Sequence, residues 1–94
     1  MTSENKDYII KLKGSFEGTG FGFSCMKRAY ELQISGQLRY INNKAIDINA
    51  IGTEDHVISF FNWCLSCKEV DSAEYRNSRH LIQINNDFNI INLI

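Results

Sequence analysis

The sequence predicts an α+β sandwich, in which an antiparallel sheet carries two helices on one of its faces. Two hydrophobic periodicities alternate along the chain: a period of two, typical of strands, and a spacing of three to four, typical of helices. They occur in the order strand, helix, strand, strand, helix, strand. The 94 residues suffice for one core between two layers and are too few for two domains.

The first strand is followed by a loop rich in glycine. A polar stretch over residues 1–7 precedes an alternating run, residues 8–13, which predicts the strand. Residues 14–22 then hold four of the six glycines of the chain. This density favours tight turns with positive φ angles. We therefore expect a polar tail over residues 1–7 and a single domain over residues 8–94.

Residues 23–33 predict the first helix because their apolar side chains recur at helical spacing. The broad stripe that we expect on this helix consists of Phe23, Cys25, Met26, Ala29, Tyr30 and Leu32. Ser35 and Gly36 interrupt the pattern and predict the end of the helix.

Two alternating runs, residues 37–41 and 45–51, predict a pair of strands. Asn42 and Asn43 between them suit a hairpin turn with left-handed backbone geometry. Thr53 is then a natural N-cap for the second helix. The expected core face of that helix consists of Val57, Phe60, Phe61, Cys64 and Leu65.

The C-terminal segment is ambiguous, since three stretches can each form a strand: residues 72–76, 80–84 and 88–91. Asn85-Asn86-Asp87 can form a turn. We expect one long edge strand or hairpin and one closing strand. The complete order, β-α-β-β-α-β, is the split arrangement of ferredoxin-like sandwiches, whose second sheet face is largely solvated.

Composition and charge argue against several classes of partner. Ten basic and eleven acidic residues give a net charge of −1, and neither sign is concentrated enough for nucleic acid or a membrane surface. The sequence shows no signal peptide and no membrane span, so we expect a cytoplasmic protein. Cys25, His56 and His80 lack the spacing of metal ligands. We expect no metal and no cofactor.

The segment Trp63-Cys64-Leu65-Ser66-Cys67 invites comparison with the W-C-x-x-C motif of thioredoxin-type proteins. That chemistry needs a cysteine at a helix N-terminus, where the helix dipole lowers the thiol pKa. Here the pair falls at the end of the predicted helix. The three cysteines of the chain therefore read as reduced thiols, and Cys64 and Cys67 as buried helical side chains.

Two segments resemble the acylphosphatase family. Gly14-Ser15-Phe16-Glu17-Gly18-Thr19-Gly20-Phe21-Gly22 is similar to the family signature G-x-V-Q-G-V-x-F-R, and Ser35-Gly36-Gln37-Leu38-Arg39-Tyr40 is similar to a small-residue turn followed by G-x-V-x-N. The resemblance covers about residues 8–66 well and the C-terminal third more loosely, through Phe88 and Ile90. It implies the same fold and, for active members, hydrolysis of acyl phosphates.

The resemblance also implies three roles: the loop amides cradle a phosphate, the arginine binds its oxygens, and the asparagine orients the attacking water. A guanidinium can engage two oxygens of a dianion, and a carboxamide can both donate to and accept from a water. In this sequence Gly22 stands at the arginine position and Tyr40 at the asparagine position. Neither residue can perform the implied role. Arg39 is expected on the opposite sheet face, and Lys27 and Arg28 on a solvated helix flank.

The sequence is consistent with two hypotheses for the function. The first is a catalytically inactive acylphosphatase-like domain that serves as a small binding or interaction module; the alternative is an acylphosphatase with a rearranged or weakened site. A weak site for a small anion or acyl phosphate would use the amides of the loop residues, which are Glu17, Gly18, Thr19, Gly20, Phe21 and Gly22. A surplus of aromatic side chains and the apolar segment 88–94 suggest a protein partner or a second copy of the chain.

Overall fold

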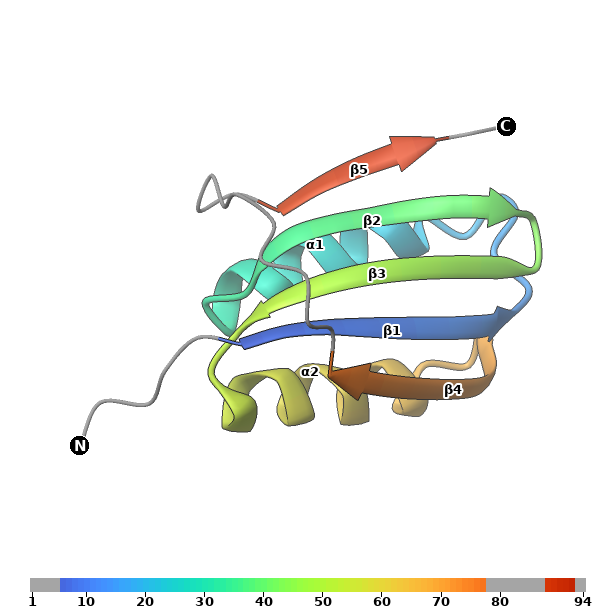
Figure 1. The fold of residues 1–94 in the computed structure, drawn as a ribbon. Coiled ribbons are helices and arrows are strands. Elements are labelled where there is room, and N and C mark those ends of the chain that lie inside the picture. The colour runs from blue at the N-terminus through green and yellow to red at the C-terminus, as the bar shows by residue number, and fades with distance from the viewer. Residues whose placement is uncertain (1–5, 78–87, 93–94) are drawn as a thin grey trace.

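The computed structural model describes residues 6–77 and 88–92 (Figure 1). Its elements are β1 (Lys6–Gly14), α1 (Phe21–Glu31), β2 (Ser35–Asn42), β3 (Ala45–Gly52), α2 (Glu54–Ser66), β4 (Val70–Asn77) and β5 (Phe88–Asn92). The strands form one sheet in the order β4-β1-β3-β2-β5. Both helices cover the same face of this sheet (Figure 1). The predicted βαββαβ sandwich is confirmed.

The first four strands pair in antiparallel fashion, as the fold class requires. β5 is an addition to that frame, because it lies parallel to β2 at the edge opposite β4. β4 and β5 correspond to the edge strand and the closing strand expected in the C-terminal third. The expected strand over residues 80–84 and the turn at residues 85–87 lie outside the described residues.

The predicted stripe on the first helix is wrong in part. α1 begins at Phe21, and its buried residues are Phe21, Gly22, Cys25 and Ala29. Phe23 and Tyr30 are 70% and 85% exposed. Residues 21, 22, 25 and 29 recur at helical spacing and form the buried face, whereas Phe23 and Tyr30 lie outside it. Helical spacing identified the helix but not the face that it buries.

The hairpin between β2 and β3 forms as predicted, but its turn geometry differs. Among the described residues other than glycine, only Gln33 has a positive φ, of 57°. Instead of a left-handed backbone, the side chain of Asn42 closes the turn: its Oδ1 accepts a hydrogen bond of 2.7 Å from the backbone amide of Lys44. This is the local turn that asparagine commonly makes with the backbone two residues ahead.

α2 begins at the predicted cap. The side chain of Thr53 accepts a hydrogen bond of 3.3 Å from the backbone amide of His56. Val57, Phe60 and Cys64 are buried. Leu65 is 46% exposed, so its predicted place in the core is wrong. The reason is that Leu65 lies one position beyond Cys64, away from the centre of the buried face.

Replacing Thr53 by Ala is expected to lower the free energy of unfolding by about 1 kcal/mol, because an orphan amide of the first turn loses its acceptor. Urea unfolding followed by the fluorescence of Trp63, the only tryptophan of the chain, measures the change. Thr53→Ser, which keeps the hydroxyl, is the matched control. Equal stability of the two variants would contradict this role of the cap.

The core adjoining the glycine-rich loop is aromatic. Phe21 and Phe60 are fully buried. The ring of Phe21 lies 5.0 Å from that of Phe16 and 6.2 Å from that of Trp63, measured between centroids. These contacts fix the start of α1 against α2. No helix in the described part of the chain is long and apolar enough to cross a membrane.

Candidate functional site

The glycine-rich loop joins β1 to α1 and is held at its base by two other connections. The amides of Gly14 and Phe16 donate to the carbonyls of Lys44 and Asn43, each at 3.0 Å, and the amide of Ser15 donates to the carbonyl of Glu69 at 2.9 Å. The loop is therefore anchored to the β2–β3 turn and to the segment that follows α2. The amides of its first three residues are thus used in backbone hydrogen bonds to these connections.

The tip of the loop is organised by the hydroxyl of Thr19. This hydroxyl donates a hydrogen bond of 2.7 Å to the carbonyl of Phe16 and accepts one of 3.2 Å from the amide of Phe21. The Thr19 amide also donates to the Phe16 carbonyl, at 3.3 Å. Gly18 and Gly20 have φ angles of 70° and 68°, a region that glycine adopts without strain. Two amides of the loop are thus satisfied within the loop.

A third amide is satisfied from β2. The backbone amide of Gly22 donates a hydrogen bond of 2.8 Å to the hydroxyl of Tyr40. An ideal Cβ placed on Gly22 would lie 2.5 Å from that hydroxyl and 3.1 Å from Cε2 of the same ring. The phenol therefore packs directly against the backbone of Gly22. Gly22 and Tyr40, which stand where the resemblance implies the arginine and the asparagine, therefore contact each other.

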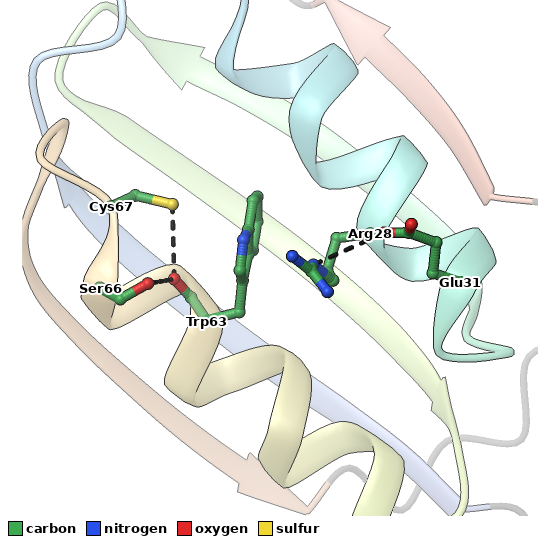
Figure 2. A network of polar contacts seen from close by, with 5 residues as sticks. All are labelled: Arg28, Glu31, Trp63, Ser66 and Cys67. Carbon is green, nitrogen blue, oxygen red and sulfur yellow. Dashed lines mark hydrogen bonds and ion pairs between the residues drawn. The ribbon is translucent and has the colours of Figure 1, made fainter.

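The basic residues considered from the sequence are held elsewhere. Arg28 lies with its guanidinium carbon 5.5 Å from the centre of the Trp63 ring, and its Nε lies 3.7 Å from Oε1 of Glu31 (Figure 2). Arg39 is exposed on β2 and is paired in register with Asp47 of β3. Lys27 is exposed on α1. The structure thus engages Arg28 at the α1–α2 surface rather than at the loop.

The six loop residues predicted as an anion site do not share one surface. Glu17, Gly18, Thr19 and Gly20 are exposed, whereas Phe21 and Gly22 are buried. The sequence reasoning missed the role of Thr19 and the contact between Tyr40 and Gly22. The sequence does contain a signal for that contact. At the two positions that the resemblance places in one site, Gly22 has no side chain and Tyr40 has an unusually large one. Whether the loop binds an anion stays a prediction.

The three thiols lie in and beside the helix layer. Cys25 and Cys64 are fully buried, and burial raises the pKa of the Cys25 thiol well above its ordinary value. Cys67 follows α2 at its C-cap and is half-buried, so its prediction as a buried helical side chain is wrong. Its thiol donates a hydrogen bond of 3.4 Å to the Trp63 carbonyl, which also accepts from Ser66 at 2.6 Å (Figure 2). Burial raises the pKa of Cys67 as well. A raised thiol pKa is the opposite of what thioredoxin-type chemistry requires.

A disulfide reagent such as Ellman's reagent is therefore expected to label Cys67 in the folded protein, and Cys25 and Cys64 only after unfolding. Because the thiolate is the reactive form and the pKa of Cys67 is raised, labelling should be slow at pH 7 and should accelerate as the pH rises above the ordinary thiol value. Cys67→Ser should abolish the native-state phase. Rapid labelling of all three thiols without denaturant would refute this assignment.

Several known proteins are similar to this chain. The acylphosphatase family model matches residues 8–90. An acylphosphatase of Synechococcus sp. strain CC9311 is 34% identical over 53 residues, which are 56% of this chain and 59% of that protein. An acylphosphatase of Synechococcus sp. strain RCC307 is 28% identical over 55 residues, 58% of this chain and 47% of that protein. The matched segment thus spans only about half the length of these relatives.

Solved structures extend the likeness of fold over nearly the whole chain. An acylphosphatase from Coxiella burnetii superposes with a TM-score of 0.81 at 19% identity, covering 93% of both chains. An acylphosphatase from Bacillus subtilis gives a TM-score of 0.80 at 23% identity, covering 90% of this chain and 97% of the other. At these identities the structures support the fold alone. Because the family model spans most of the sequence, the chain belongs to the acylphosphatase family.

Proposed function

We propose that this chain is an acylphosphatase-fold module that does not hydrolyse acyl phosphates at enzyme rates and acts instead through binding. The observation that supports this most strongly is the contact between Gly22 and Tyr40, at the two positions where the family resemblance implies the substrate-binding arginine and the water-orienting asparagine.

The chemistry explains why these two positions matter. Hydrolysis of an acyl phosphate needs a water aligned with phosphorus and a positive charge to stabilise the phosphoryl oxygens. Gly22 supplies no side chain, and the hydroxyl of Tyr40 already accepts the Gly22 amide. Loss of a single preorganised donor lowers a catalytic rate by about 10²- to 10³-fold. Loss of the dianion-binding guanidinium together with the asparagine should lower it further.

The rest of the loop supports the same proposal. The amides of Thr19, Phe21 and Gly22 each have an acceptor within the protein, so a phosphate would have to displace existing hydrogen bonds. Glu17 adds an exposed carboxylate to the same loop, and like charges in proximity oppose binding of a dianion. We therefore expect any binding of a small anion or acyl phosphate to be weak.

A binding role is supported by the outward face of α1. Phe23, Met26 and Tyr30 recur at helical spacing and are 70%, 37% and 85% exposed. Neighbouring exposed apolar side chains are a common feature of protein interaction surfaces. This surface begins at Phe23, one residue after Gly22, and runs along α1 to Tyr30.

The second candidate, a working acylphosphatase with a rearranged site, is favoured by family membership. Hydrolysis of benzoyl phosphate by the purified, unmodified protein separates the two. We expect a rate that does not exceed that of the same protein after thermal denaturation. Saturable turnover at ordinary enzyme rates, about 1 to 10³ per second, would refute the proposal and favour the alternative.

A further inference from the structure

We propose that Tyr40 blocks the loop. Its hydroxyl accepts the hydrogen bond from the Gly22 amide that an oxyanion oxygen would otherwise accept, so a tetrahedral oxyanion and the Tyr40 ring cannot be bound there together. This inference deepens the proposed function and rests on it. It assigns to Tyr40 the control of ligand access, a role distinct from the loss of catalysis.

The N-terminus of α1 is capped from outside the helix. Its N-cap is Gly20, which makes no side-chain capping hydrogen bond, and no acidic residue lies in the first turn. The first amides of a helix have no acceptor inside the helix and need one from outside. The hydroxyl of Thr19 accepts the amide of Phe21, and the hydroxyl of Tyr40 accepts that of Gly22. Tyr40 therefore caps α1 from a strand 18 residues away in the chain.

The phenol of Tyr40 also fills the space beside Gly22. The Tyr40 oxygen lies 2.8 Å from the Gly22 nitrogen, which is the distance at which an oxygen of phosphate would accept the same amide. The ring lies against the site that a Cβ of Gly22 would fill, since Cε2 and Cζ are 3.1 Å and 3.2 Å from that point. Glycine at position 22 thus makes room for the phenol. One amide cannot serve both oxygens, because they would occupy the same place.

Tyr40 belongs to the same chain as the amide that it caps. Tyr40 is held by β2, in which Leu38, two residues earlier, is fully buried in the core. The phenol is therefore presented to Gly22 without the entropy loss of recruiting a free ligand. An anion arriving from solvent must displace the ring before it reaches the amide. The unmodified protein should therefore bind little phosphate at concentrations that saturate a variant without the Tyr40 ring.

The test is a titration of ¹⁵N-labelled protein with inorganic phosphate, followed through the amide signal of Gly22. Tyr40→Ser removes the ring, whereas Tyr40→Phe keeps the ring and removes only the hydroxyl. We expect phosphate to bind Tyr40→Ser at least tenfold more tightly than the unmodified protein, with a saturable shift of the Gly22 signal. Tyr40→Phe should expose the Gly22 amide to faster hydrogen exchange but should bind phosphate no more tightly than the unmodified protein.

Ile41→Ser is the matched control, because Ile41 adjoins Tyr40 on β2 and is 43% exposed, and its loss should change neither phosphate binding nor the hydrogen exchange of Gly22. If Tyr40→Ser does not fold, Tyr40→Asn removes the ring with a larger polar side chain and gives the same comparison. A Gly22 signal that shifts with the same midpoint in the unmodified protein and in the variant without the Tyr40 ring would overturn the inference. The inference would also be overturned if the variant without the Tyr40 ring bound phosphate no more tightly than the unmodified protein.

This outcome is independent of the hydrolysis assay. If the unmodified protein turned over benzoyl phosphate, the proposed function would fail whatever the titration showed. If it did not, and phosphate also failed to reach Gly22 in the variants without the ring, only the role of Tyr40 in blocking the loop would fail.

Discussion

Replacing Gly22 by Arg and Tyr40 by Asn together is expected to raise the hydrolysis of benzoyl phosphate at least about 100-fold over the unmodified protein. The arginine would supply the charge for the phosphoryl oxygens. The asparagine would release the amide of residue 22 and provide a group that can orient water. The backbone of the loop is already anchored to the β2–β3 turn and to Glu69, so the scaffold on which these groups would act is in place.

The single variants serve as controls for the double variant. Gly22→Arg alone places a Cβ 2.5 Å from the Tyr40 hydroxyl, so the ring must move; we expect lower stability and little gain in rate. Tyr40→Asn alone opens the amide but supplies no positive charge. A Gly22→Arg variant as active as the double variant would show that Tyr40 does not obstruct the site.

Gly36→Ala is expected to be the most destabilising of the substitutions considered. Gly36 lies in β2 with a φ of 126°, and a Cβ there would lie 1.9 Å from the carbonyl oxygen of Asn49 in β3. Backbone strain of this kind costs about 1 to 3 kcal/mol, and overpacking costs a similar amount. We expect a loss of about 3 to 5 kcal/mol in the free energy of unfolding, because the paired strands would have to separate.

Gly18→Ala isolates the contribution of strain alone. Gly18 has a φ of 70°, but no atom lies within 4 Å of its ideal Cβ. This variant should lose only about 1 to 2 kcal/mol. Urea unfolding of both variants measures the difference, and failure of Gly36→Ala to fold agrees with the larger effect. If Gly36→Ala lost no more stability than Gly18→Ala, the close approach of β2 to β3 at this position would be wrong.

The fold was predictable from local patterns because each element has a signal that acts over a few residues. Alternation identified β1 and β3, and Thr53 identified the start of α2. The buried face of α1 was not predictable in this way, because apolar residues lie both inside and outside that face. The parallel pairing of β5 with β2 is a long-range property that alternation does not contain.

The sequence named the residues of the candidate site but could not predict how they are arranged. The resemblance drew attention to Gly22 and Tyr40 as the substituted positions. It could not show that they bond to each other, since 18 residues separate them and the contact depends on the packing of β2 beneath α1. The hydroxyl of Thr19 likewise lies in a sequence position with no distinctive pattern, and only the folded loop reveals what it organises.

The phenol of Tyr40, and not a ligand, accepts the hydrogen bond from the Gly22 amide. The most direct test of this contact is a crystal structure of the unmodified protein soaked in phosphate. The predicted result is an intact hydrogen bond from Gly22 to Tyr40 and no phosphate at that amide. A phosphate bound at Gly22, with the ring displaced and a lysine or arginine side chain contacting its oxygens, would contradict the account.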